Sequence, residues 1–519
     1  MSLPRFCDRI IDAALPLLDG LKHEELISHL EKHTTRLDCS NITEDDAGLS
    51  AGYLLAANLL ARLYPRIVFS GPEELTTMAG DLAREINPVV DCDGSPTFTL
   101  SFSPDVPDNA GVAVTASGWN VIVDGAISGA IASAAPPAAL AAAAVGVGEI
   151  FRMVFADFIP HGRKEPQPGS FNLVTLESWS DVPLPDMFDV GSVHLAGAGA
   201  IGEAVAETLR ATPVKGKLIV VDPQTIDDFN MQRYLIAKDS DVGKRKTVLV
   251  ARSLAKTEIE VVEVPTFWGD DERSAPGQRV VLAALDTAED RIGVQAGLHG
   301  RVYNAYTQPN DIGWSRHEHF GVEPCLACLY WPAGTKPHRY ELIASVLEQP
   351  ALRVRGYLAT NTPVGKPLPA SFQLPAIESP PSPEEIQQWR NIPILADIAD
   401  AFGLQKDALD EWTNKSIDDL YREGICGGAI VRTRSEETAR DMLVPLAHQS
   451  ALAGIMLAVQ ILVASDDNLR KLRPQKIEGR YNILRRVPTT IAIPSSRVSN
   501  CICSDEDFKT AWNHRWIQE

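Results

Sequence analysis

A glycine-rich turn joins an apolar run to a helical run near the middle of the chain, in the sequence VHLAGAGAIGEAVAETL (193–209). Gly197, Gly199 and Gly202 have the GxGxxG spacing, which lets a strand turn sharply into a helix while the backbone approaches a phosphate. Asp222 ends the next apolar run, KLIVVD, where an acid can accept hydrogen bonds from ribose hydroxyls. We therefore expect a nucleotide-binding turn, with a purely structural turn as the alternative.

Apolar runs alternate with helical or loop segments after this turn. EIEVVEV, QRVVLAALD and RVYNAY follow KLIVVD in that order. Alternating strands and helices are typical of a parallel, doubly wound α/β sheet. The sequence therefore predicts a Rossmann-like α/β domain.

The first part of the chain repeats the pattern weakly. Residues 51–74 have the same order of helix, apolar strand and proline turn as residues 200–224, and Gly71 stands about where Asp222 stands. The Ala-rich run after Pro137 resembles residues 445–465, but the first copy has no GxGxxG. We expect a degenerate half fused to an intact half; the alternative is that Ala-rich helices resemble one another by composition.

Composition and charge exclude several kinds of partner. The net charge of −20 argues against nucleic acid, whose phosphates require concentrated Lys and Arg. Asp8 and Asp12 interrupt the apolar N-terminal pattern, which does not fit a signal peptide. The uncharged run 125–148 is rich in Ala, Gly and Ser and is split by Pro136 and Pro137, as expected of a buried helix that begins at the prolines. We expect a soluble, cytoplasmic protein with no membrane or nucleic-acid partner.

Cationic and amide side chains follow the expected ribose-binding acid. The run DPQTIDDFNMQRYLIAKDSDVGKRK contains Asn230, Arg233 and Lys246. Cleavage of a phosphoanhydride requires such groups, because negative charge builds up on the phosphates. Asp286, which ends the apolar run VVLAALD, supplies the carboxylate oxygen that magnesium prefers. Hydride transfer by a NAD-dependent dehydrogenase needs residues that we do not find here.

The run from Gly197 through Asp286 resembles the superfamily of ThiF, MoeB and ubiquitin-activating enzymes, in the glycine loop, VD, FNMQR, DVGKRK and LDTAEDR. The resemblance implies ATP as substrate, with ribose at Asp222, the triphosphate at Asn230, Arg233 and Lys246, and Mg²⁺ at Asp286. It also implies adenylation of the C-terminal carboxylate of a ubiquitin-like protein. Two features depart from the pattern: Thr287 replaces an expected asparagine, and RFCDR only vaguely matches the N-terminal arginine motif. We assign no arginine from the first half to ATP.

Four of the eight cysteines occur in pairs, Cys325 with Cys328 in EPCLACLYWP and Cys501 with Cys503 in NCICSDEDF. Thiolates in C-x-x-C and C-x-C pairs can form a tetrahedral structural zinc site. Such a site would fasten the C-terminus to the sheet, as zinc does in the family. Reduced thiols without metal are the alternative.

Cys426 lies between glycines in YREGICGGAIVRTR, with Arg422, Arg432 and Arg434 nearby. Glycine leaves the backbone sterically open, and cations lower a thiol pKa, which favours the thiolate that attacks acyl groups. The family resemblance raises the case for a thioester-forming nucleophile; a small buried residue is the alternative. Cys7, Cys39 and Cys92 lack such settings.

These observations predict an organisation and a reaction. We expect a degenerate adenylation-like domain at 1–165, a linker at 166–190 and the first part of an adenylation domain at 191–328. A catalytic-cysteine insertion follows at 329–427, and the return helix with the zinc-binding C-terminus at 428–519. In CGG (426–428) followed by VPLAHQSALAGIMLA (444–458), the chain resembles bacterial ubiquitin-activating-like enzymes of Bil-type antiphage conjugation operons. This resemblance implies thioester transfer to a conjugating enzyme. A sulfur-carrier or peptide adenylyltransferase without a thioester step, and a non-catalytic scaffold, are the alternatives.

Overall fold

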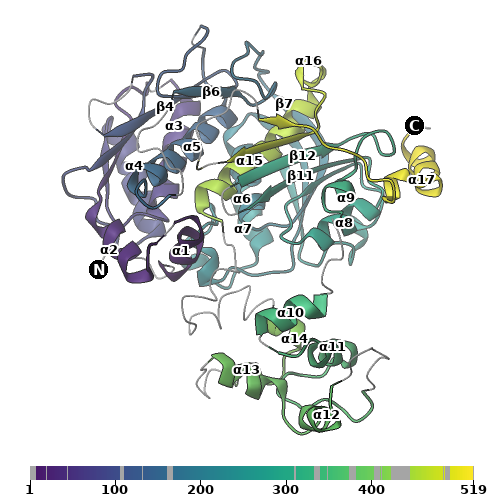
Figure 1. The fold of residues 1–519 in the computed structure, drawn as a ribbon. Coiled ribbons are helices and arrows are strands. Elements are labelled where there is room, and N and C mark those ends of the chain that lie inside the picture. The colour runs from purple at the N-terminus through teal and green to yellow at the C-terminus, as the bar shows by residue number, and fades with distance from the viewer. Residues whose placement is uncertain are drawn as a thin grey trace. The chain divides into compact units, whose positions relative to one another are not determined.

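The computed structural model describes most of the chain, in two units. The described residues are 7–18, 20–43, 45–105, 110–130, 132–159, 168–308, 311–331, 339–347, 349–372, 381–402, 410, 412–421, 445–482, 484 and 491–517. The larger unit combines Met1–Trp331 with Leu443–Glu519, and the smaller unit is Pro332–Met442. Mixed α/β structure fills the larger unit, as predicted (Figure 1).

The first half of the larger unit contains a sheet whose described strands have the order β2-β1-β3-β4-β5-β6. The pairs β2–β1, β1–β3 and β3–β4 are parallel, whereas the pairs β4–β5 and β5–β6 are antiparallel. The strands are β1 (Thr35–Asp38), β2 (Ile67–Ser70), β3 (Phe98–Phe102), β4 (Gly111–Ser117), β5 (Asn120–Val123) and β6 (Gly169–Asn172). The helices are α1 (Cys7–Ala14), α2 (His23–Lys32), α3 (Ala47–Ala61), α4 (Glu73–Ile86) and α5 (Pro136–Val154), with a 3-10 turn at Leu15–Leu17.

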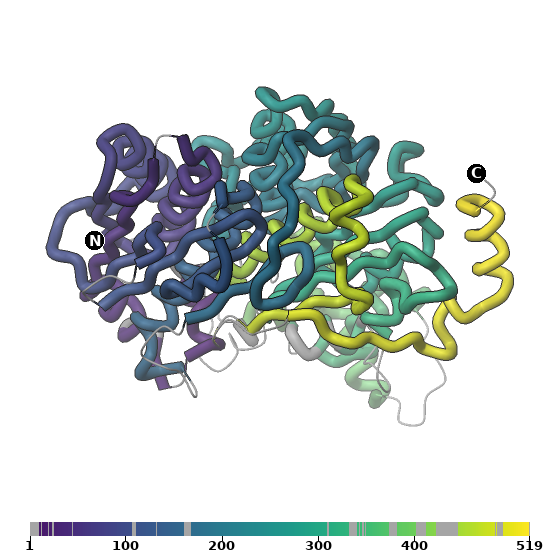
Figure 2. The backbone as a smooth tube through the Cα atoms, turned by 90° about the horizontal axis from the view of Figure 1, so that it is seen from above, coloured from purple at the N-terminus to yellow at the C-terminus, as the bar shows by residue number. Residues whose placement is uncertain are grey.

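The second half contains a larger sheet, whose described strands have the order β14-β13-β12-β11-β10-β7-β8-β9. The strands are β7 (Phe188–Ala196), β8 (Val214–Val221), β9 (Glu258–Val264), β10 (Val280–Ala283), β11 (Arg301–Thr307), β12 (Asp311–His317), β13 (Glu478–Asn482) and β14 (Ala492–Ile493). The helices are α6 (Ala200–Ala211), α7 (Lys246–Leu254), α8 (Ala288–Ala296), α9 (Leu326–Leu329), α15 (Ala447–Ser465), α16 (Asp467–Leu472) and α17 (Glu506–Trp516). Figure 2 shows the C-terminal segment, in yellow, leading from this sheet to α17.

The two sheets share one topology, as the sequence repeat predicts. Strands β2-β1-β3-β4-β5-β6 correspond to β8-β7-β10-β11-β12-β13, with the same parallel and antiparallel neighbours. The turn after the first strand of each copy makes the same hydrogen bond: Cys39 N–H donates to Ser70 O at 2.8 Å, and Gly197 N–H donates to Val221 O at 2.9 Å. Gly71 directly follows β2, at the place of Asp222 after β8. The first copy therefore lacks the residues that make the second a nucleotide-site candidate.

Two long apolar helices, α5 and α15, pack inside the larger unit. Both are long and apolar enough to cross a membrane, but 94% of the tested window of each is buried in the protein. Helix α5 begins at Pro136, as predicted from the sequence. Small residues allow close packing: a Cβ at Gly454 would lie 2.4 Å from the backbone oxygen of Ile201 on α6, and one at Gly52 would lie 2.6 Å from that of Ala139 on α5.

The predicted linker at 166–190 is partly wrong. Strand β6 pairs with β5 in the first sheet, so that sheet extends beyond the predicted boundary at 165. Phe171 and Leu173 are buried there, which shows that apolar burial holds this stretch in the sheet despite the prolines on either side. Trp119 Nε1 donates to Pro183 O at 3.0 Å, so the proline-rich part is anchored too. Strand β7 begins at Phe188, three residues before the predicted domain start at 191.

The smaller unit is helical in its described part. Its helices are α10 (Arg339–Leu347), α11 (Ala351–Thr360), α12 (Pro383–Trp389), α13 (Ile394–Phe402) and α14 (Ile417–Asp419). Tyr357, Ile398 and Leu420 are among the buried residues of its own core. The unit begins at Pro332, slightly later than the predicted insertion at 329, because Leu329 belongs to α9. It ends at Met442, beyond the predicted end at 427.

Candidate nucleotide-binding site and cysteine cluster

Each glycine of the GxGxxG turn has its own steric reason. Gly197 has φ +97°, and a Cβ there would lie 2.6 Å from Ala284 O. A Cβ at Gly202 would lie 2.2 Å from Gly197 O, inside the first turn of α6. One at Gly199, the N-cap of α6, would lie 3.4 Å from the hydroxyl of Tyr234. At these three positions the turn presents only backbone near the N-terminus of α6, which is where an anion is favoured.

Asp222 holds the glycine turn from the next strand. Its Oδ2 accepts a hydrogen bond from Ala198 N–H at 2.8 Å, and its Oδ1 accepts one from Gln224 N–H at 2.8 Å. The side chain is 7% exposed. Each carboxylate oxygen can accept more than one hydrogen bond, so these contacts leave acceptor capacity for ribose hydroxyls.

Lys246 is the first residue of α7 and is buried. Its Nζ donates to Gln224 Oε1 at 2.6 Å and to the hydroxyl of Tyr234 at 2.9 Å. Burial on its own lowers the pKa of Lys246, but Tyr234 and Asp222 outweigh it and the pKa is raised. The group is thus a fixed positive charge beside Asp222, the acid that directly follows β8.

Arg233 and Asn230 lie on the connection between β8 and α7. A 3-10 turn at Asp228–Asn230 closes this connection, and Asn230 Oδ1 accepts from Asp227 N–H at 3.0 Å. The guanidinium of Arg233 lies 5.6 Å from the ring centre of Tyr234, and Lys246 Nζ lies 5.0 Å from the same ring centre. The structure therefore brings Arg233 and Lys246 together around one aromatic ring.

Tyr234 and Gln224 were missed by the sequence reasoning. Tyr234 is 4% exposed, contacts both cations and faces the position where Gly199 lacks a side chain. The available signal was the aromatic residue directly after Arg233 in FNMQRY. No comparable residue pattern marks Gln224, whose role depends on the path of the chain after β8.

Asp286 lies in the loop after β10, not at the end of the strand as predicted. The strand ends at Ala283, because its pairing with β7 stops at Ala196, where Gly197 turns the neighbouring chain away. Asp286 is exposed. Thr287, which stands where the family expects asparagine, caps α8 by accepting from Asp290 N–H at 3.1 Å. The accessible carboxylate fits a magnesium ligand at this edge of the sheet.

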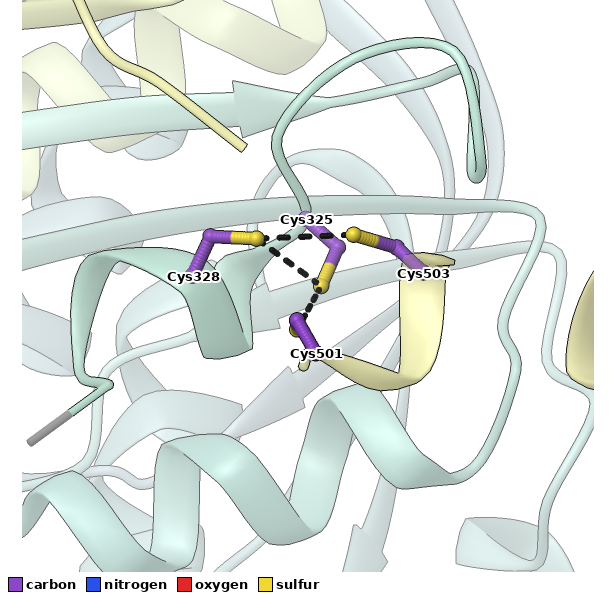
Figure 3. A group of neighbouring side chains, drawn as sticks. All are labelled: Cys325, Cys328, Cys501 and Cys503. Carbon is purple, nitrogen blue, oxygen red and sulfur yellow. Dashed lines mark hydrogen bonds between the residues drawn. The ribbon is translucent and has the colours of Figure 1, made fainter. Parts of the chain in front are cut away.

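The four paired cysteines converge on one place, although 172 residues separate the pairs (Figure 3). Cys325 and Cys328 come from the start and body of α9, and Cys501 and Cys503 from the 3-10 turn Ile502–Ser504. Their sulfurs lie within 4.8 Å of one another, at 3.4 Å for Cys325–Cys501 and for Cys328–Cys503. All four are buried and free of disulfides.

This geometry fits a tetrahedral metal site. A Zn–S bond of about 2.3 Å places the sulfurs of a tetrahedron about 3.8 Å apart, whereas a disulfide needs about 2.05 Å. The sulfur–sulfur distances of 3.4–3.9 Å in three of the cysteine pairs agree with the tetrahedral metal site and not with a disulfide. These residues would hold zinc as a structural cross-link, because thiolates fill all four positions.

The C-terminal helix is also anchored by its tryptophans. Trp512 Nε1 donates to His299 O at 2.8 Å, and Trp516 Nε1 donates to Leu298 O at 3.0 Å. Both acceptors belong to the segment between α8 and β11. The C-terminus is therefore held against the second sheet by indole hydrogen bonds as well as by the cysteine cluster.

Cys426 and the arginines Arg422, Arg432 and Arg434 lie outside the described residues. The nucleophile hypothesis for Cys426 therefore stays a prediction.

Known proteins place the chain in a family. An uncharacterized protein of Sinorhizobium fredii, y4jF, is 29% identical over 540 residues, which cover 99% of this chain and 98% of that protein. The structure of E. coli MccB with MccA-N7isoASN matches 31% of this chain at 22% identity and a TM-score of 0.26, and that of MccB alone matches 41% at 19% and 0.26. These matches span 50% and 54% of the MccB chains. Residues 176–462 match the sequence profile of the ThiF family, more than half of the chain, and the chain belongs to the ThiF family.

Proposed function

We propose that this chain is an ATP-dependent adenylyltransferase that activates the C-terminal carboxylate of a ubiquitin-like protein. The observation that carries the proposal is the meeting of Lys246, Tyr234 and Arg233 beside the glycine turn and Asp222. A nucleotide with its ribose at Asp222 and its phosphates at the N-terminus of α6 would find both cations on the phosphate side. Membership in the ThiF family supports adenylyl transfer.

The reaction balances as a displacement at the α-phosphorus of ATP. A carboxylate oxygen of the carrier protein forms a bond to that phosphorus, and the bond to the oxygen bridging to the β-phosphate breaks. The electron pair leaves with pyrophosphate, and the carrier becomes an acyl-adenylate. Lys246 and Arg233 would stabilise the charge that builds up on the phosphate oxygens. Mg²⁺ held by Asp286 would neutralise phosphate charge when bound.

A second step would use Cys426. Its thiolate would attack the acyl carbon of the adenylate and expel AMP, which leaves a thioester on the enzyme. The acyl group would then pass to a cysteine of a conjugating enzyme. The glycines around Cys426, the neighbouring arginines and the resemblance to Bil-type antiphage enzymes support this step. The zinc site would be structural.

The test is ATP–pyrophosphate exchange in the presence of a purified ubiquitin-like protein with a free C-terminal carboxylate. We expect exchange by the wild type, loss of at least about 10²-fold in Asp286→Asn, and none of that loss in Glu289→Gln, a neighbouring exposed carboxylate on α8. Wild-type enzyme that shows no exchange, or Asp286→Asn with full activity, contradicts the proposed site.

The thioester step has a separate readout. We expect a carrier–enzyme adduct that added thiols cleave by acyl transfer, and its loss in Cys426→Ala with exchange retained. Exchange by the wild type without any thiol-sensitive adduct would instead assign the sulfur-carrier or peptide adenylyltransferase reaction. An adduct that survives Cys426→Ala removes that cysteine from the role.

A further inference from the structure

Arg62, from the first half of the chain, is buried at the end of α3. Its side chain is 1% exposed, and its Nε donates to Asn58 Oδ1 at 2.8 Å on the same helix. Burial lowers the pKa of Arg62 to about 10, with Glu203 opposing the shift. The guanidinium therefore remains charged near neutral pH in a place where an unpaired charge is costly.

The other donors of Arg62 reach the second half of the chain. One terminal nitrogen donates to Met231 O, and the other donates to Leu235 O at 3.3 Å and Ala237 O at 3.1 Å. Asn58 Nδ2 also donates to Leu235 O, at 2.9 Å. Three carbonyls of the segment 231–237 are thus held by two side chains of α3 and its cap.

Glu203 of α6 holds the same segment through its amides. Its Oε2 accepts from Ile236 N–H at 2.7 Å and from Ala237 N–H at 3.3 Å, and its side chain is fully buried. The segment therefore lies between Arg62, which donates hydrogen bonds to its carbonyls, and Glu203, which accepts hydrogen bonds from its amides. Glu203 follows directly on Gly202, so this arrangement ties the segment to the glycine turn as well.

The held segment carries Arg233 and Tyr234. We propose that Arg62 is a positioning residue. By donating hydrogen bonds to backbone carbonyls of residues 231–237, it fixes the positions of Arg233 and Tyr234 in the nucleotide site. The degenerate half thereby serves the intact half in cis, through hydrogen bonds to the backbone of the segment that carries Arg233 and Tyr234. This inference rests on the proposed function for its ATP readout, but not for its backbone readout.

Arginine suits this task better than lysine, because its fixed fork directs several donors at once. Arg62→Lys keeps the charge and loses the simultaneous contacts to Met231, Leu235 and Ala237. Arg152→Lys is the matched control: Arg152 is another arginine of the first half that is 2% exposed, and its ion pair is with Glu149 on its own helix α5. Both variants place a lysine at a buried arginine position. Of the two native arginines, Arg62 is the one whose hydrogen bonds reach residues 231–237.

The first measurement is amide hydrogen exchange of residues 231–237 without nucleotide. We expect faster exchange at Ile236 and Ala237 in Arg62→Lys, and unchanged exchange there in Arg152→Lys. Asn58→Asp is the milder second variant, since it keeps the acceptor for Arg62 Nε and removes the donor to Leu235 O. Unchanged exchange in this segment for both Arg62→Lys and Asn58→Asp overturns the proposal, whatever reaction the protein performs.

The second measurement is binding of a fluorescent ATP analogue with Mg²⁺, which needs no carrier protein. We expect a Kd raised about tenfold in Arg62→Lys and within about twofold of wild type in Arg152→Lys. Equal weakening in both variants would assign Arg62 a merely structural role. A wild type that binds no ATP defeats the proposed function, and the exchange comparison still decides the positioning role.

Discussion

The ammonium of Lys246 lies 2.9 Å from the phenolic oxygen of Tyr234, and Tyr234 in turn faces the bare Cα of Gly199 at the start of α6. Lys246 begins α7, Tyr234 lies on the connection before that helix, and Gly199 belongs to the turn after β7. Three separate stretches of chain therefore meet at one charge. A buried lysine with two neutral acceptors, Gln224 and Tyr234, keeps its charge available for an anion.

Removing this charge is expected to abolish most of the phosphate chemistry. Lys246→Ala should lower the ATP–pyrophosphate exchange rate by about 10²-fold or more, because a fixed donor at a developing charge is lost. Tyr234→Phe should cost only several-fold, since Lys246 keeps Gln224. Lys217→Ala is the control, because Lys217 pairs with Glu260 on the exposed face of β8 and β9. Equal rates for Lys246→Ala and Lys217→Ala would place the phosphates elsewhere.

A methyl group at Gly197 is expected to disrupt the turn beyond its backbone strain. Gly197→Ala places a Cβ 2.6 Å from Ala284 O at φ +97°, whereas Gly269→Ala has nearly the same φ, +92°, with nothing within 4 Å. Both variants share the strain of about 1–2 kcal/mol for a left-handed residue, and only the first adds a clash. Nucleotide binding should fall in Gly197→Ala and stay near wild type in Gly269→Ala. Fluorescent-nucleotide titration of both variants tests this, and intact binding in Gly197→Ala would show that the turn can move.

Zinc is expected at one ion per chain. Metal analysis of the purified protein should give about one equivalent, and Cys503→Ser should reduce it and lower the melting temperature, because the metal links α9 to the C-terminal turn. Cys92→Ser is the control, since Cys92 is a free cysteine outside the cluster. A chelator should release the ion from wild type with a similar loss of stability. Protein without metal that melts like the zinc-loaded protein would contradict a structural role.

Local patterns predicted the features that depend on local chemistry. The three glycines, the strand that ends before Asp222 and the two cysteine pairs were identified because turn sterics and metal chemistry demand those residues at those spacings. The repeat was visible because β2 and β8 each follow an apolar helix. Gly71 marked where the first copy lacks a counterpart of Asp222.

The sequence could not reveal contacts that depend on backbone position. Asp286 was placed at a strand end, but β10 ends at Ala283, where its pairing with β7 stops because Gly197 turns the chain away. Arg62 contacts carbonyl oxygens, which every residue type has, so no residue pattern in 231–237 marks its partner. Such contacts follow from how the two halves pack, and a single sequence carries no record of that packing.

His448 makes the stability of the fold sensitive to acid. Its ring lies on α15 against Gly148 and Phe151 of α5, it is 2% exposed, and its Nε2 has no hydrogen-bond partner among the described residues. Burial lowers its pKa to about 3. The folded state therefore keeps the ring neutral, while the unfolded chain takes up a proton near its ordinary pKa of 6.5.

The resulting stability is present above pH 6.5 and is lost as the pH falls from there toward pH 3. Between pH 7 and pH 5 this group alone should reduce the free energy of unfolding by about 2 kcal/mol. His448→Asn cannot ionise, so the stability difference between wild type and variant should shift by that amount in urea titrations at the two pH values. His514→Asn, at an exposed position on α17, is the control. For this variant, the difference from wild type in the free energy of unfolding should be the same at both pH values. A wild-type-to-His448→Asn difference that is the same at both pH values would mean that the buried ring accepts its proton without leaving the core.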